Sequence, residues 1–338
     1  MGRLLSLFCI DLLTILAQTA PPRGESNWKQ ICERATAAPL QAPSFKASAA
    51  ESSLAHCDSA ALYYGFNGAP DPAAALQCAW YQRAHPNPSV GDAFAGPGVL
   101  AMLYANGRGV ARDYGLAIRF ACENTWAADA EMEGRIGHLE QLRDSHAQSA
   151  KFDLCDDATS GLMEGACESV QQQFAGAKRR QGVDAISARW SPRVKTAFKA
   201  LNAAEDAFVE ARTANEVDLS GSGRAAFSLA EEGRLRDQFL IDLRRLASGS
   251  LPAASSASFL EADRSLNEVY GQIRQSPSSA WQGTVNPEGI RETEFAWLKL
   301  RDAWVEFARV AYPRVSADSV RTQITRLRIH QLQSLKPR

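Results

Sequence analysis

The sequence lacks an excess of charge of either sign. Its 338 residues include 37 Lys and Arg against 38 Asp and Glu, which leaves a formal net charge of −1 at pH 7. Proteins that bind nucleic acids usually carry a basic excess, because they must neutralise phosphates. We therefore expect no nucleic-acid partner.

Long apolar runs are also missing, and a membrane span needs about 20 apolar residues. The longest run, residues 4–16, follows a positively charged start and leads to the small residues Ala17 and Ala20. This order is typical of a secretory signal. We predict a signal peptide over 1–20, a periplasmic or secreted location, and no membrane span in the mature chain. Asp11 lies inside the run, where a charge is costly, and the alternative is a buried N-terminal helix.

The sequence also has little that indicates catalysis. It contains no phosphate loop, no Gly-x-Ser-x-Gly elbow and no dinucleotide fingerprint. The five histidines do not share metal-ligand spacing; they are His56, His85, His138, His146 and His330. We therefore expect no enzyme activity, no cofactor and no metal ion.

Cysteine is present in a pattern that indicates disulfides. The chain has seven cysteines, of which Cys9 falls in the predicted signal peptide. An even number in an exported chain is typical of disulfide pairing. The alternative is a set of buried free thiols in a cytosolic protein. The six that remain are Cys32, Cys57, Cys78, Cys122, Cys155 and Cys167.

Residues 52–127 contain two related units, each predicting a helix, a Gly-containing turn and a second helix. The first unit covers 59–68 and 71–81, and the second covers 98–110 and 113–122. Glycine suits the end of the first helix, where a left-handed residue is needed. An aspartate stands where each second helix needs an N-cap, at Asp71 and Asp113.

These units resemble the Sel-one-like repeat, an αα-hairpin related to tetratricopeptide repeats. The first unit departs by having Ala69 and Pro70 where a Gly-Val would stand. The resemblance implies hairpins that bury their faces against neighbouring helices. The second unit is the closer match, through Leu100, Tyr104, Gly107, Gly109, Val110, Asp113, Ala117 and Ala121.

Geometry favours one set of disulfide pairs. One pair should face across the first hairpin, since its two cysteines lie about equally far from the turn near Gly68. A second pair would close the short segment 155–167. Elimination leaves the third pair between the N-terminal arm and the second hairpin. The expected disulfides are Cys57–Cys78, Cys155–Cys167 and Cys32–Cys122.

We predict a duplication in the rest of the chain. Residues 206–210 (DAFVE) match residues 302–306 (DAWVE) at an offset of 96. Apolar residues near both segments recur at helical spacing, and β-branched alternation is nearly absent. We predict an all-α fold, with αα-hairpin repeats followed by two small helical bundles.

The predicted organisation follows from these patterns and from composition. A stretch rich in Pro, Ala and Ser precedes the hairpins and is expected to be extended, with a short helix near Trp28. A Ser-rich linker separates the two copies. The expected divisions are a signal peptide 1–20, an extended arm 21–51, the repeat region and connecting helix 52–150, a first unit 151–248, a linker 249–258 and a second unit 259–338.

In the second unit, residues 262–270 (ADRSLNEVY) place an Ala-Asp, a Leu-Asn and a Tyr in one predicted helix. This pattern resembles the opening helix of the LprI-type lysozyme inhibitor family. That family carries an Ala-Asp, Leu-Asn and Tyr signature in its opening helix, and a cysteine pair that resembles Cys155 and Cys167. We expect two signature residues, Asn267 and Tyr270, to bridge helices through buried hydrogen bonds. The matching residues are Ala262, Asp263, Leu266, Asn267 and Tyr270, then Leu300, Trp304, Thr325, Arg326 and Leu327.

The LprI resemblance implies a protein that binds a lysozyme-type hydrolase. Lysozymes are typically cationic, so an inhibitor should present an acidic surface. The alternative for such a cluster is a solvated helix face. We expect a non-enzymatic protein that occludes or scaffolds its partner; the second hypothesis is a structural adaptor of an envelope complex that uses the repeat surface. The candidate contact residues surround the Cys155–Cys167 segment and are Asp153, Asp156, Asp157, Glu164 and Glu168.

Overall fold

The computed structural model describes most of the chain as helices. Within the described residues there is no strand, which confirms the all-α prediction. No helix in that part of the chain is both long and apolar enough to span a bilayer. The predicted signal peptide and most of the predicted arm lie outside it. The described residues are 27–40, 54–86, 93–124, 127–145, 149, 151–277, 280–281 and 283–335.

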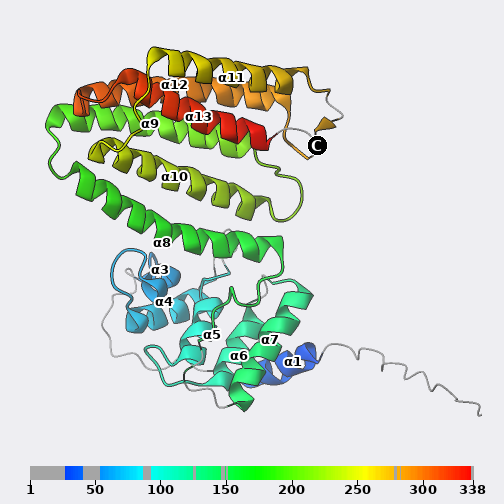
Figure 1. Cartoon of the computed structure of the whole chain (residues 1–338). Helices are drawn as coiled ribbons and strands as arrows, with labels where there is room; N and C mark the ends of the chain where they lie inside the picture. Colours follow the sequence, from blue (N-terminus) through cyan, green and yellow to red (C-terminus); the bar gives the residue numbers. More distant parts are fainter. Residues whose placement is uncertain are drawn as a thin grey trace, which may run out of the picture.

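The N-terminal helices form one body, drawn at the bottom of Figure 1. α1 falls where the short helix of the arm was expected, and α3–α4 and α5–α6 form the two predicted hairpins. α7 packs beside α6 as the connecting helix. We call this part the repeat body. Its helices are α1 (Trp28–Ala37), α3 (Ser59–Tyr64), α4 (Pro72–Ala84), α5 (Pro97–Asn106), α6 (Tyr114–Glu123) and α7 (Asp129–Asp144).

The ends of the hairpin helices follow from particular residues. The Asp71 and Asp113 side chains accept hydrogen bonds from the backbone N–H three residues later, as N-caps do. Gly65 and Gly107 end α3 and α5 with φ of 79° and 61°, a conformation that costs other residues steric strain. The predicted turn chemistry therefore sets where each hairpin bends.

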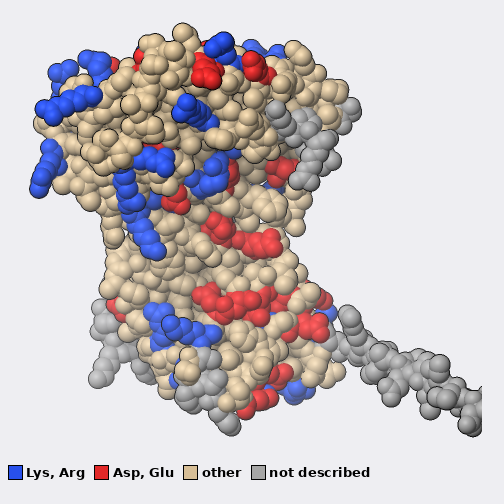
Figure 2. Space-filling model, in the orientation of Figure 1, with Lys and Arg blue, Asp and Glu red and all other residues tan. Residues whose placement is uncertain are grey.

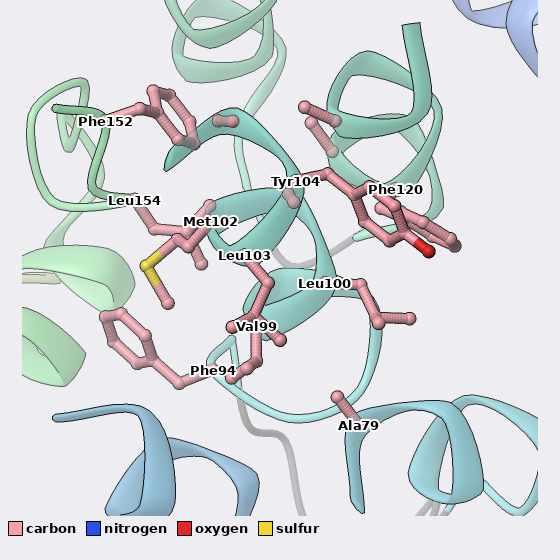
Figure 3. Packing of buried hydrophobic residues seen from close by; sticks show 14 of the residues in the cluster. Ala79, Phe94, Val99, Leu100, Met102, Leu103, Tyr104, Phe120, Phe152 and Leu154 are labelled. Carbon is pink, nitrogen blue, oxygen red and sulfur yellow. The ribbon is translucent and has the colours of Figure 1, made fainter. Parts of the chain in front are cut away.

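α5 is the centre of the first core. Its residues from Gly98 to Ala105 are all buried. Figure 3 shows their side chains pointing outward in several directions toward the surrounding helices. Phe152 and Leu154 enter the same core from the segment that precedes α8, and both are almost fully buried. The repeat body is therefore packed around one apolar helix, α5. The helical hairpin pattern of the sequence does not by itself predict that one helix is buried on all sides.

Three disulfides tie this part of the chain together, in the same pairs that the sequence indicated. Cys57–Cys78 crosses the first hairpin and Cys32–Cys122 joins α1 to α6. Cys155–Cys167 joins the segment before α8 to the first half of that helix. Each bridge contributes roughly 2–4 kcal/mol by restricting the unfolded chain.

The C-terminal helices form a second body, drawn at the top of Figure 1, and α8 lies between the two. Met163 and Cys167 in the first half of α8 belong to the core of the repeat body. Val183 and Ile186 in its second half pack against the other core. The helices are α8 (Gly161–Ser187), α9 (Pro192–Asn215), α10 (Arg224–Ser248), α11 (Ser256–Gln275), α12 (Pro287–Ala311) and α13 (Ala317–Ser334).

The two C-terminal units share a single core. α9 and α12 lie antiparallel in its middle: the Thr293 hydroxyl donates to the Ala211 carbonyl at 3.2 Å, and Gly289 lies against Asn215. Phe208 and Trp304, which occupy matching positions of the duplicated segment, are both buried in this core. The two expected bundles therefore pack as one body across the 249–258 linker.

A buried ion-pair network crosses this shared core. The Arg328 side chain is fully buried and donates to Glu216 at 2.5 and 2.9 Å and to Glu294 at 2.5 Å. Arg212 also pairs with Glu216 and donates to Glu231 at 2.5 Å. These residues come from α10, α12, α13 and the α9 region. Buried charges are tolerated only when they are paired, so the network requires all four segments to be in register.

We predict that Arg328→Ala destabilises the fold by about 3–5 kcal/mol, because it removes the ion-pair partner of the buried Glu294 and leaves Glu216 paired with Arg212 alone. Urea unfolding followed by circular dichroism measures this free energy. Arg326→Ala, an exposed position on the same helix, is the control and should change stability by less than about 0.5 kcal/mol. Equal effects of the two variants would contradict the role given to the network.

Candidate protein-binding site

The acidic residues predicted around the Cys155–Cys167 disulfide do lie together, but they bond mainly to the protein itself. Asp153 accepts a hydrogen bond from the Tyr64 hydroxyl at 2.7 Å and one from the Cys155 N–H at 3.0 Å. Asp156 accepts from the Asp153 N–H at 2.8 Å. These bonds shape a tight turn, so Asp153 is largely structural.

The other three predicted acidic residues differ in whether their carboxylates bond to the protein or face solvent. Asp157 pairs with His138 at 3.0 Å, and Glu168 accepts from Gln172 at 2.8 Å. Glu164 is exposed, as is Asp156. Figure 2 shows acidic side chains gathered across the narrow middle of the molecule, where α8 lies. We call the five predicted residues the acidic band, and among them Asp156 and Glu164 face solvent.

A buried carboxylate holds this acidic turn in place. Glu131 on α7 is fully buried and accepts from the Thr159 N–H at 3.3 Å, the Ser160 N–H at 3.1 Å and the Ser160 hydroxyl at 2.9 Å. Arg135 pairs with the same carboxylate at 2.7 Å. Because Ser160 is also the N-cap of α8, this cluster fixes both the turn and the start of the helix.

An open groove of about 510 Å³ lies between α11 and α12 in the C-terminal unit. We call it the α11–α12 groove. Asp263 and Arg301 face each other across it at 3.9 Å. Its lining residues are Asp263, Leu266, Asn267, Tyr270, Arg274, Arg291, Glu294, Phe295, Trp297, Leu298 and Arg301.

The residues that carry the LprI resemblance divide between the core and this groove. Ala262 and Leu266 are buried, as packing requires. The expectation that Asn267 bridges two helices is wrong: it is exposed and donates to the Asp263 carbonyl of its own helix at 2.9 Å. Tyr270 faces the groove and, within the described residues, makes no hydrogen bond to another helix. Asp263, Asn267 and Tyr270 therefore reach the groove, where Asp263 is bonded to Asn267 and paired with Arg301.

The α12 side of the groove presents apolar side chains to solvent. Phe295 is 54% exposed and Leu298 is 37% exposed, and both lie off the apolar stripe that buries Trp297. Arg291 stacks over Phe295 at 5.4 Å and Arg301 over Trp297 at 5.3 Å. Exposed aromatic side chains next to arginine are typical of protein-protein interfaces. The sequence analysis did not single out Phe295 and Leu298. Both are apolar residues outside the buried stripe of α12, and that position is the signal that could have identified them.

A smaller cavity gathers ionisable groups inside the shared core. It has a volume of about 40 Å³ and is lined by Glu205, Asp242 and Arg328 together with apolar side chains. Such a volume holds a water molecule and excludes a substrate. Burial raises the pKa of Glu205 to about 8, against the opposing effect of Arg236. This cavity is therefore a small polar space inside the core and is too small to be an active site.

We predict that Glu205→Gln stabilises the protein in a pH-dependent way. The folded-state pKa of this carboxyl lies above its unfolded value of 4.5, so the wild type loses stability as pH rises from 4.5 to about 8. The variant lacks this loss and should be more stable by ~3 kcal/mol at pH 7.

Thermal unfolding at pH 5 and pH 7.5 tests this prediction, since the gap between the Tm values of variant and wild type should be wide at pH 7.5 and nearly closed at pH 5. Glu210→Gln, an exposed position on the same helix, is the control. A gap that stays the same at both pH values would show that the Glu205 carboxyl is not buried in this way.

Across the part of the chain that the structure describes, no group of three or more His, Cys, Asp and Glu side chains is arranged to hold a metal ion.

The α11–α12 groove is thus open and presents apolar side chains to solvent, which suits contact with a protein surface. Residues 247–332 match the family model described as Lysozyme inhibitor LprI. The match covers α11, α12 and most of α13, and thus the whole α11–α12 groove. It does not extend to residues 52–127, so the Sel-one-like resemblance there stays a prediction. Comparisons with curated proteins and with solved structures find no significant match.

Proposed function

We propose that this chain is an exported, non-enzymatic protein that binds a lysozyme-type hydrolase and occludes it through the α11–α12 groove. One observation carries the proposal: the segment that matches the LprI family is the segment that forms the groove. Three signature side chains that are not fully buried, Asp263, Asn267 and Tyr270, all line it. Their position is explained if the groove receives a partner.

The chemistry of the groove suits a protein surface as its occupant. Phe295 and Leu298 supply apolar area that would be desolvated on contact, which is the usual source of interface affinity. Asp263 and Asn267 offer polar groups at the edge of that area. The acidic band, with Asp156 and Glu164 exposed, would attract a cationic enzyme over a longer range.

Export is supported by the disulfides. Three bridges close within the described residues. Disulfides persist in oxidising compartments such as the periplasm and are rare in the cytosol. We therefore place the protein in the periplasm or outside the cell, in agreement with the signal-like order of residues 1–20.

The second candidate function is a structural adaptor of an envelope complex. It is favoured by a hollow of about 540 Å³ on the repeat body, lined by Tyr63, Asn106 and Arg108 among others. Tethering the purified protein to beads and incubating it with envelope extract separates the two functions. A single lysozyme-type hydrolase supports occlusion, and several assembly proteins support the adaptor.

We expect the protein to inhibit a lysozyme, and we expect Phe295→Ala and Leu298→Ala to weaken inhibition at least about tenfold each, because each removes apolar contact area at the groove. Lysis of a cell-wall suspension at increasing protein concentration gives the inhibition constant. Phe227→Ala is the matched control, since Phe227 is 55% exposed on α10, far from the groove in sequence. Inhibition by all variants equal to wild type would exclude the groove, and no inhibition at micromolar wild-type protein would exclude a lysozyme partner.

The acidic band should act on the rate of association. We expect Asp156→Asn combined with Glu164→Gln to slow association with a cationic lysozyme several-fold at low salt, because long-range attraction is reduced. At high salt the difference should vanish through screening. Surface plasmon resonance at both salt concentrations measures this, with Glu210→Gln on α9 as a control. An unchanged association rate at low salt would show that the acidic band is only a solvated surface and does not attract the partner.

A further inference from the structure

A second opening lies at the narrow middle of the molecule and is larger than the α11–α12 groove. This waist cleft has a volume of about 740 Å³ and lies between α8, α10 and the repeat body. Ligand pockets for small molecules span about 300–1,000 Å³, so its size suits a small ligand. Its lining residues are Tyr64, Asp153, Cys155, Asp156, Cys167, Val170, Gln171, Phe174, Ala175, Lys178, Arg179, Asp237, Leu240 and Arg244.

The floor of the waist cleft is apolar. Val170, Phe174 and Leu240 line it, and Phe174 remains 41% exposed. The Phe174 ring meets the Tyr64 ring edge-on at 5.9 Å, which joins α8 to the repeat body at this point. An exposed aromatic side chain inside a concave site is a surface on which an apolar side chain of a ligand can pack.

One end of the cleft is cationic. Lys178 on α8 and Arg244 on α10 are both exposed, and within the described residues neither forms an ion pair. Gly182 leaves room for this arginine, since a Cβ there would lie 2.8 Å from the Arg244 guanidinium. The neighbouring Arg179 forms an ion pair with Asp237 at 3.0 Å. Two unpaired cations at one end of a cleft suit a carboxylate.

The other end of the cleft is acidic. Asp153 and Asp156 belong to the turn that the disulfide and the Glu131 cluster hold in place. Asp156 is exposed, so it can accept a hydrogen bond from an ammonium group. Along α8, Cys167 marks this acidic end and Lys178 marks the cationic end. At 1.5 Å per residue the two ends lie roughly 16 Å apart, the length of about five residues of extended chain.

We propose that the waist cleft binds a short peptide of about five residues with free ends. Its amino end would lie at Asp156 and its carboxylate between Lys178 and Arg244, with apolar side chains against Phe174. An anion alone would leave the acidic wall unused, and a cation alone would leave the two basic side chains unused. This site lies outside the segment that matches the LprI family, and it shares Asp153 and Asp156 with the acidic band of the proposed function.

Isothermal titration calorimetry of the whole protein tests the proposal. The probes are pentapeptides with alanine at the outer positions and Leu, Phe or Tyr in the centre, each made with free ends, N-acetylated or C-amidated. We expect free peptides to bind and each cap to weaken binding at least about tenfold, since each removes one charge-assisted contact. No binding of any free peptide at about 1 mM, or equal binding of capped and free peptides, would overturn the proposal.

A variant cycle identifies the carboxylate end. Arg244→Ala should lower the affinity for the free peptide several-fold. It should not lower the affinity for the amidated peptide further, because the substitution and the amide remove the same contact. Lys178→Ala should behave in the same way. Arg180→Ala, exposed on α8 and outside the lining, is the control and should leave binding unchanged. Additive effects of the variant and the amide would overturn the placement of the carboxylate.

Discussion

The structure depends on α8 being buried from two sides. Its first half supplies Met163 and Cys167 to the core of the repeat body, and its second half packs Val183 and Ile186 against the C-terminal core. A helix of 27 residues is long enough to reach both. Its start is held by Ser160 and the buried Glu131. Since one rigid helix belongs to both cores, the two bodies cannot turn independently without unpacking one of them.

The C-terminal body uses paired charges inside an apolar core. Arg328 and Glu216 bring α13 and the end of α9 together, although removal of two ions from water is expensive. Burial of apolar side chains, to which Phe208 and Trp304 contribute, supplies the main favourable energy. The ion pairs restrict which register of the helices is allowed, because a shift of one turn would leave a buried charge unpaired.

This architecture separates two surfaces with different chemistry. The α11–α12 groove is open, carries Phe295 and Leu298, and suits a folded protein. The waist cleft has charged ends and suits a small ligand. Figure 1 places α11 at the top and α8 at the waist, with α9 and α10 between them. A hydrolase held at the groove would therefore leave the waist cleft accessible from solvent.

Local features of the sequence determined the helices, their caps and the pairs Cys57–Cys78 and Cys155–Cys167, because hairpin turns and apolar spacing act over a few residues. The distant pair Cys32–Cys122 followed only by elimination. The repeated DAFVE and DAWVE segments likewise predicted the central helices α9 and α12. The sequence misled at Asn267, since helical spacing does not tell whether a polar side chain meets a second helix or its own. The shared C-terminal core and the waist cleft were decided only by tertiary packing, which brings Tyr64, Asp156 and Arg244 to one opening although they lie far apart along the chain.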